Sequence, residues 1–144
     1  MLRLTRATYM EMVAHCLAGL PDEACGLLVG SYGGDEATHL FLTVNAAASA
    51  MVYEIDPREM LRVDRAAQDL GADIMGVFHS HTHTDAYPSP TDVAQATDPG
   101  WHYVLVSLRD TLPVLRSYLI REGTITEEPV EVPGLEFLVP DGPG

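Results

Sequence analysis

The stretch at residues 79–92 constrains the fold of this chain more than any other. Its first two histidines, His79 and His81, follow directly on an apolar run at residues 74–78, which is typical of a buried β-strand. Side chains alternate between the two faces of a strand, so His79 and His81 are predicted to point the same way and Ser80 the opposite way. We therefore expect the chain to fold around a strand that delivers two imidazoles, side by side, at its end.

A carboxylate that would complete this pair follows at Asp92. Two histidines, one carboxylate and one open position form the site of a zinc hydrolase, and zinc is the metal that this donor set favours. Residues 89–92 are also typical of a helix start, with Ser at the N-cap and Pro at the first position. The two interpretations are compatible, since a first-turn acid can turn inward. His83 is an alternative third ligand, ranked below Asp92, and a surface loop can also carry histidines without any metal.

The same stretch resembles the signature of the JAMM (MPN+) zinc metalloproteases, which reads H-[ST]-H, seven residues, Ser, two residues, Asp. Every defining position is present between His79 and Asp92. The family also has a Glu far upstream, in a stretch E-x-x-G-x-L-x-G, and residues 23–30 match it with Glu23 at the first position. The resemblance covers about residues 2–130, and its one departure is Thr82, where many members carry Pro.

The resemblance implies a site and a mechanism. It implies one zinc ion per chain, with the three ligands His79, His81 and Asp92. A carboxylate that is not a ligand must move a proton to the leaving amine, and Glu23 has this role in the family. On composition alone, Glu23 is a solvated acid in a turn. Ser89 would donate a hydrogen bond to the oxyanion of the tetrahedral intermediate, and Ser80 would support the ligands from behind.

The family hydrolyses peptide or isopeptide bonds beside the C-terminal Gly-Gly tails of ubiquitin-like proteins. Residues 86–93 and 102–110 particularly resemble the small bacterial type that removes cysteine from a ubiquitin-like sulfur-carrier protein. Such a carrier is therefore the partner that the resemblance implies. A Gly-Gly tail can pass a narrow groove, and it can add as a strand to an exposed sheet edge.

The loop at residues 45–56 lies beside the substrate cleft in the family. Its residues Met51, Val52 and Tyr53 are predicted to grip an extended peptide, with ordinary loop packing as an equal alternative. Two other functions stay open: a non-catalytic MPN scaffold or interaction module, and a deubiquitinase-like JAMM peptidase with another substrate. A deaminase is excluded, because its H-x-E and P-C-x-x-C motifs are absent.

The order of the predicted elements favours an α/β sandwich around a mixed sheet. The predicted helices span residues 5–20, 57–70 and 90–96. The predicted strands span residues 25–29, 37–44, 73–78, 102–108 and 114–120, and a last one begins at residue 125. Helical spacing predicts two buried stripes: Met10, Val13, Ala14 and Leu17, then Met60, Leu61, Val63, Ala67 and Leu70. The family implies a three-layer sandwich with a curved mixed β-sheet flanked by helices, similar to the cytidine deaminase fold.

Composition limits the class of protein and its partners. The chain has 144 residues, 47% of them hydrophobic, which suits one compact domain. No run is long and apolar enough to span a membrane, and no apolar signal core follows the N-terminus, so a cytoplasmic location is expected. The net charge of −13 argues against nucleic acid as a partner, since phosphates would be repelled.

The sequence also allows predictions for the two cysteines and for the C-terminal residues. Cys16 and Cys25 are predicted to be small buried hydrophobes rather than a disulfide, with a catalytic Cys25 paired to a histidine as a minor alternative. The metalloprotease domain is expected at residues 1–130, and a Pro- and Gly-rich arm or tail at residues 131–144. The apolar residues of this arm are expected to dock on the domain or to support a homodimer: Leu135, Phe137, Leu138 and Val139.

Overall fold

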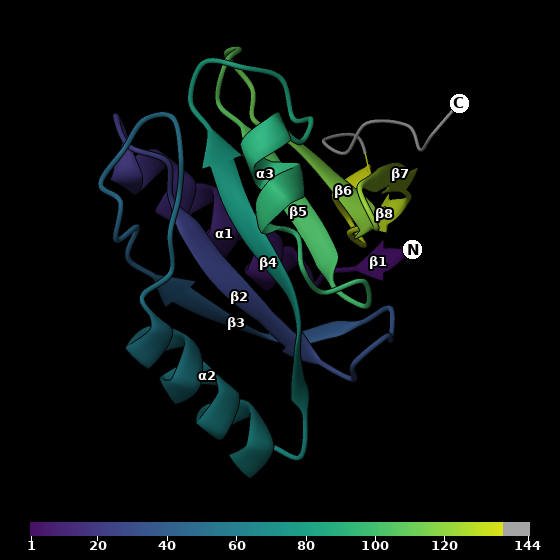
Figure 1. Ribbon diagram of the computed structural model, residues 1–144. Coiled ribbons are helices and arrows are strands. Elements are labelled where there is room, and N and C mark those ends of the chain that lie inside the picture. The colour runs from purple at the N-terminus through teal and green to yellow at the C-terminus, as the bar shows by residue number, and fades with distance from the viewer. Residues whose placement is uncertain (137–144) are drawn as a thin grey trace.

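A mixed six-stranded sheet runs through the centre of the molecule (Figure 1). The computed structural model describes residues 1–136. In spatial order the sheet contains β3 (Ala37–Thr43), β2 (Cys25–Gly30), β4 (Asp73–His81), β5 (His102–Ser107), β6 (Val114–Arg121) and β7 (Thr124–Glu128). β4 and β5 are parallel, and the other neighbours are antiparallel. The predicted mixed sheet is confirmed, and the strand that carries the two histidines lies in its interior.

Helices cover both faces of this sheet (Figure 1). α1 (Arg6–Gly19) lies on one face, whereas α2 (Pro57–Asp69) and α3 (Pro90–Gln95) lie on the other. Each face has its own hydrophobic core: Phe78 of β4 belongs to the α1 side, and Val77 of the same strand belongs to the α2 side. The predicted three-layer α/β sandwich is therefore confirmed.

The predicted helix starts are confirmed by their caps. The Thr5 hydroxyl accepts the Thr8 N–H at the start of α1, and the Asp56 carboxylate accepts the Arg58 N–H at the start of α2, where Pro57 takes the first helical position. Such caps satisfy N–H groups that have no partner inside the helix. Local sequence chemistry therefore sets where these helices begin.

The predicted buried stripe of α1 is correct only at Val13, which is partly buried and packs on the core. Met10 and Leu17 are 55% and 50% exposed, and Ala14 is also exposed. The helix buries a different face, which contains Thr8, Tyr9, Met12 and Cys16. The apolar side chains of α1 itself are spread around nearly its whole circumference, so their spacing does not select one face. Packing against the sheet decides which side is buried.

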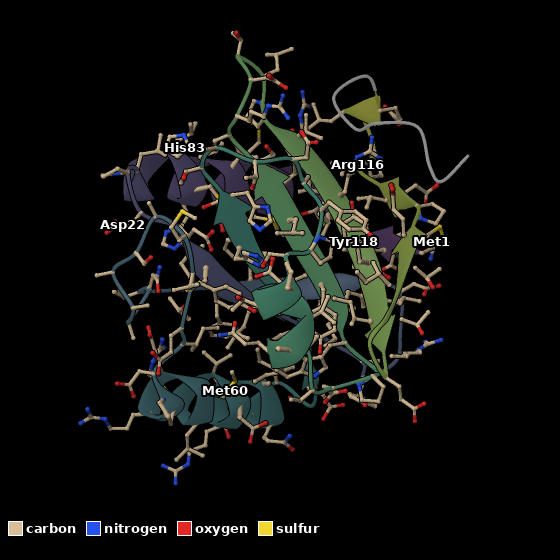
Figure 2. The ribbon with its side chains drawn as sticks, turned by 45° about the horizontal axis from the view of Figure 1, so that its top comes forward. Met1, Asp22, Met60, His83, Arg116 and Tyr118 are labelled. Atoms are coloured by element: carbon tan, nitrogen blue, oxygen red, sulfur yellow. The ribbon has the colours of Figure 1, made fainter. Side chains whose placement is uncertain are left out.

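The predicted stripe of α2 is correct for Met60, Val63 and Ala67 and wrong for Leu61 and Leu70. Val63 and Ala67 are buried, and Met60 points from the helix toward the sheet (Figure 2). Leu61 and Leu70, by contrast, are about half exposed. Leu61 lies beside Met60 in the sequence and so faces away from the core, and Leu70 is the C-cap residue.

Two short strands join the beginning of the chain to the segment after β7. β1 (Leu2–Arg3) pairs in parallel with β8 (Val130–Glu131), and neither strand was predicted. Val132 and Leu135 are buried in the core on the α1 side, which confirms the docking expected of Leu135. Phe137, Leu138 and Val139 lie outside the described residues, and the division of the chain at residue 130 stays a prediction.

Both cysteines are free and buried, as predicted. Burial raises the pKa of the Cys25 thiol to about 11, and the thiol contacts the Thr43 hydroxyl at 3.3 Å. Neither feature suits a nucleophile, which needs an accessible thiolate. Among the helices within residues 1–136, none combines the length and apolar character needed to span a membrane.

Candidate active site

The two histidines at the end of β4 face the same side of the sheet. β4 contains one extra residue relative to β2, since Leu28 pairs with Gly76 and Val29 with Ile74, which leaves Met75 as a β-bulge. After this bulge the alternation is regular, so His79 and His81 share the face covered by α2 and α3. The strand thus ends in two imidazoles that point toward α3.

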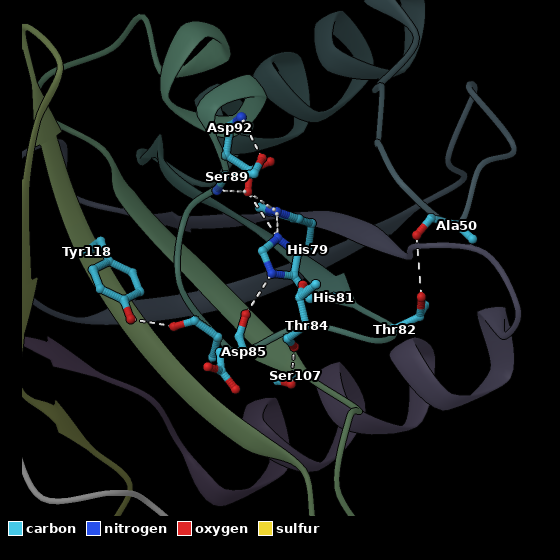
Figure 3. A network of polar contacts seen from close by, with 11 residues as sticks. Ala50, His79, His81, Thr82, Thr84, Asp85, Ser89, Asp92, Ser107 and Tyr118 are labelled. Carbon is cyan, nitrogen blue, oxygen red and sulfur yellow. Dashed lines mark hydrogen bonds and ion pairs between the residues drawn. The ribbon is translucent and has the colours of Figure 1, made fainter.

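Asp92, in the first turn of α3, meets this pair (Figure 3). The Nε2 atoms of His79 and His81 lie 3.3 Å apart. Asp92 Oδ2 lies 3.2 Å from His79 Nε2 and 3.0 Å from His81 Nε2. All three side chains are buried, and their ligand atoms converge on one point. The structure brings together the three predicted ligands.

These separations fit a tetrahedral metal ion. Donors about 2.0–2.1 Å from a zinc ion in tetrahedral geometry lie roughly 3.3 Å from one another. The observed separations of 3.0 to 3.3 Å are close to this value. Two imidazoles and one carboxylate leave a fourth position free for water or substrate. The residues present therefore form a site suited to a metal ion.

Hydrogen bonds prepare the ligands for metal. His81 Nδ1 donates to the backbone oxygen of Asp85 at 2.8 Å, which turns Nε2 toward the position of a metal. Burial lowers the pKa of His81, but its hydrogen bonds to Asp92 and to the Asp85 oxygen outweigh burial and raise that pKa, so a metal ion would displace the Nε2 proton. Burial lowers the pKa of His79, which favours the neutral ring. Burial would raise the pKa of Asp92, but hydrogen bonds from His79, His81 and the Ser89 N–H outweigh it and lower that pKa. A neutral imidazole and an ionised carboxylate are the forms that bind a metal.

Asp92 both caps its helix and faces the histidines. The Ser89 N–H donates to Asp92 Oδ2 at 2.9 Å, and the Asp92 N–H donates to Ser89 Oγ at 3.1 Å. This reciprocal pair is a capping box, and it confirms the helix start predicted at residues 89–92. A hydroxyl that accepts one bond can still donate another, so the Ser89 O–H is available to a substrate oxygen.

Glu23 is a buried acid next to this site. It precedes β2 and is 5% exposed, so its interpretation as a solvated turn acid is wrong. Burial raises the pKa of Glu23 to about 7; the nearby His81 opposes this rise and the nearby Asp92 adds to it. No group within residues 1–136 forms a hydrogen bond with Glu23 Oε1. Glu23, His81 and Ser89 line one small cavity of about 110 Å³.

Ser80 supports the site differently from the prediction. It does point to the face opposite the histidines, where its Oγ accepts the Ala24 N–H at 2.8 Å. The Ser80 N–H in turn donates to the Ala24 oxygen at 3.0 Å. Ser80 therefore holds the segment that carries Glu23, and among the described residues its hydroxyl forms no hydrogen bond with either histidine ring.

The other predicted site residues, His83 and the three loop residues at 51–53, differ in burial and in position. His83 is exposed on the loop after β4 (Figure 2), where it lines the small cavity, and it lies outside the group of converging ligand atoms. Met51 lines the same cavity and is 77% exposed. Val52 is half-buried, and the Tyr53 ring stacks on His79 with centroids 4.3 Å apart. The three loop residues therefore do not form one exposed patch.

Comparisons with known proteins agree with this geometry. The model of the family described as prokaryotic homologs of the JAB domain matches residues 5–121. The chain is similar to the CysO-cysteine peptidase of Mycobacterium tuberculosis, with 49% identity over 84% of each chain. It is similar to a protein from Desulfitobacterium hafniense with known solution structure: the TM-score is 0.83, with 36% identity over 92% of each chain. A JAB1/MPN domain protein from Archaeoglobus fulgidus shares the fold, with TM-score 0.59 and 19% identity over 91% of this chain and 96% of that one.

The chain therefore belongs to the prokaryotic JAB domain family, and its fold is the JAMM/MPN fold expected from the motif. This membership, together with the similarity to a curated peptidase, confirms the predicted class of enzyme, a hydrolase of the JAMM peptidase type. Two contributors to the site were not predicted. Asp85 orients His81 through its backbone oxygen, and Asn45 binds the backbone of Glu23 through its side chain.

Proposed function

We propose that the protein is a zinc-dependent peptidase that cleaves the bond after the C-terminal Gly-Gly of a ubiquitin-like sulfur-carrier protein and releases cysteine. The observation that carries this proposal is the convergence of three buried donor atoms beside a buried acid with a free oxygen. The similarity to a CysO-cysteine peptidase supports the choice of substrate. His79, His81 and Asp92 would hold the zinc ion.

Glu23 suits the role of the group that moves the proton. Zinc bound at this site would polarise the scissile carbonyl and lower the pKa of a water molecule to about 7. Glu23 is not one of the converging ligands, and its pKa of about 7 allows it to take a proton and return it near neutral pH. Its free Oε1 would accept the proton of the attacking water and then deliver it to the leaving amine.

Ser89 suits the role of oxyanion donor. Its Oγ is fixed at the helix N-cap, where it accepts the Asp92 N–H. The hydroxyl proton is thereby directed away from the helix, and Ser89 lines the same cavity as Glu23. A donor that is fixed before the reaction can stabilise charge as it develops, without first having to reorganise.

The loop at residues 45–54 supports binding of an extended tail. Among the described residues, neither the N–H nor the C=O of Tyr53 has a hydrogen-bond partner, so both are free to pair with an added strand. A groove of about 220 Å³ adjoins this residue and is lined by aromatic and aliphatic side chains, among them Ile55, Trp101 and Tyr103. The 110 Å³ cavity, which Met51 and Thr82 also line, suits a single small amino acid as the leaving group.

The test uses a sulfur-carrier protein that ends in Gly-Gly-Cys. The purified protein is incubated with this carrier, and the carrier mass is followed, beside a Glu23→Gln variant and a chelator-treated sample; metal content is measured for each. Loss of one cysteine residue with the untreated wild type alone, together with about one zinc per chain, is the expected result. No cleavage despite bound zinc would refute the sulfur carrier as substrate and favour another tail. A wild-type protein without bound metal would favour the alternative function, a non-catalytic MPN scaffold or interaction module.

Two further expectations belong to this proposal. The enzyme would act in the cytoplasm, where ubiquitin-like sulfur carriers are expected, and this is tested by fractionation of cells that express the tagged chain. A homodimer stays a prediction, and sedimentation at several protein concentrations tests it.

A further inference from the structure

We infer that the loop at residues 45–54 positions both halves of the catalytic centre: the Tyr53 ring orients His79, and the Asn45 side chain fixes Glu23. This inference rests on the proposed metal site, and it adds two positioning residues that the JAMM signature does not contain. Loop 45–54 lies between β3 and α2, so it belongs to neither of the segments that carry the ligands.

The two histidines are oriented by different means. His81 donates its Nδ1–H to the Asp85 oxygen, which is the usual way to fix a ligating imidazole. Among the described residues, no hydrogen bond to His79 Nδ1 is found. Instead, the Tyr53 ring lies against the His79 ring with centroids 4.3 Å apart and planes inclined by 22°. Offset stacking of this kind restricts rotation of both rings.

Tyr53 is itself held firmly. It packs against the core on the α2 side and adjoins the groove lined by Ile55, Val77 and Trp101. The loop is also tied to the segment after β4, because the Thr82 hydroxyl donates to the Ala50 oxygen at 3.3 Å (Figure 3). A ring fixed in this way can hold the plane of His79 before a metal binds.

Asn45 is the centre of a hydrogen-bond network that reaches Glu23. Its Nδ2 donates to the backbone oxygens of Glu23 at 2.9 Å, Val52 at 3.0 Å and Ser49 at 3.4 Å. Its Oδ1 accepts the N–H groups of Ala47 at 3.0 Å and Glu54 at 2.9 Å. Among side chains of the size of asparagine, only the amide has N–H donors on one side and an oxygen acceptor on the other.

The loop therefore holds the Glu23 backbone from both sides. The Glu23 oxygen accepts from Asn45, and the Glu23 N–H donates to the Ser49 oxygen at 2.8 Å. The next residue, Ala24, is bound by Ser80 of β4. Since a shift of about 1 Å in a catalytic group can reduce the rate about 100-fold, this network sets how well Glu23 can act.

The first test separates stacking from mere bulk. Tyr53→Phe keeps the ring, and Tyr53→Leu keeps an apolar side chain without a ring. Zinc affinity, measured by competition with a chromogenic chelator, is expected to stay within about 2-fold in Tyr53→Phe and to fall about 10-fold or more in Tyr53→Leu. Thermal unfolding of the metal-free proteins reports any loss of folding; Tyr53→Met replaces Tyr53→Leu if the latter unfolds. Equal zinc affinity in the Phe and Leu variants would overturn the role of Tyr53.

The second test concerns Asn45. Asn45→Asp keeps the size and both acceptor contacts, but it places an oxygen against three carbonyl oxygens. Ala46→Ser, an exposed change in the same loop, is the matched control. Amide hydrogen exchange at Glu23 and Ala24 is expected to accelerate about 10-fold or more in Asn45→Asp alone, while zinc affinity stays within about 2-fold of wild type. Unchanged exchange would overturn the role of Asn45.

Both readouts are independent of the substrate. If the wild type binds zinc but cleaves no carrier, the proposed substrate fails while the affinities and exchange rates still decide the inference. If it does cleave the carrier, Asn45→Asp is expected to lower kcat about 10-fold or more with little change in KM, because the position of Glu23 affects the chemical step more than binding. A loss confined to KM would contradict a positioning role.

Discussion

Glu23→Gln is expected to stabilise the metal-free protein at high pH. Burial raises the pKa of Glu23 from its ordinary value of 4.5 to about 7. The folded protein therefore binds this proton more tightly than the unfolded chain, and folding becomes less favourable as pH rises from about 4.5 to about 7. Each pKa unit corresponds to about 1.4 kcal/mol, so above pH 7 the ionised Glu23 costs up to about 3 kcal/mol of stability. Glutamine has nearly the same volume and no charge, so it removes this cost.

The assay is urea unfolding of both proteins, with metal removed, at pH 4 and at pH 8. At pH 4, where Glu23 is protonated, the free energy of unfolding of the variant is expected to match that of the wild type within about 0.5 kcal/mol. At pH 8 it is expected to be higher than that of the wild type by about 1–3 kcal/mol. Other titrating groups affect both proteins alike and cancel in the difference. With zinc bound, the difference at pH 8 should shrink, since the cation favours the ionised carboxylate.

If the difference in free energy of unfolding between Glu23→Gln and the wild type is the same at pH 4 and pH 8, this reasoning is refuted, because burial then does not disfavour the ionised form of Glu23. A variant less stable than wild type at pH 8 would refute it more strongly, since the carboxylate would then be a net stabilising group. The expected result instead makes Glu23 a residue kept for chemistry at the expense of stability.

Three other measurements test the rest of the molecule. Asp92→Asn is expected to reduce bound zinc, measured by elemental analysis, to a small fraction of the wild-type amount, because it removes the anionic donor; full retention would contradict the ligand set. Native Cys25 should react with iodoacetamide at least about 10-fold more slowly than in the denatured chain, since burial raises its pKa to about 11; equal rates would contradict this. His102→Gln should cost about 1–3 kcal/mol in urea unfolding, because it removes the imidazole that lies 2.6 Å from the buried Glu128 and leaves that carboxylate with only the N-terminal ammonium and the Ser117 hydroxyl as partners. Burial opposes ionisation of His102, but Glu128 and the Gly34 oxygen raise its pKa above the ordinary 6.5, so this stabilisation is present at about pH 6 and lost as pH rises through that pKa; no loss between about pH 6 and pH 9 would contradict it.

The sequence predicts the ligand pair well because its geometry is local. Alternation along the last residues of β4 suffices to place His79 and His81 on one face, and it does not depend on how the strand begins. The bulge at Met75 reverses the faces of the earlier residues, and it arises from pairing with β2, about 45 residues upstream. Period-two reasoning over the whole strand would therefore assign its first residues to the wrong face.

Other features depend on packing that no local pattern records. The buried side of α1 is decided by the sheet, because the helix is apolar on nearly all sides. β1 and β8 are two residues long, too short to show any periodicity. Asn45 is equally ordinary in the sequence: a polar residue at the start of a loop, whose five bonds exist only when the loop is folded.

The spacing of the motif follows from the physical demands on Asp92. A carboxylate that must reach two buried imidazoles needs a backbone whose position is fixed, and the first turn of a helix provides such a position for Asp92. Pro90 and the capping box set where α3 begins, so Asp92 Oδ2 accepts the Ser89 N–H before any metal is present. The loop between His81 and Ser89 must then be long enough to turn the chain back over the end of β4. Its backbone oxygen at Asp85 also orients His81, so the same loop fixes one ligand and places another.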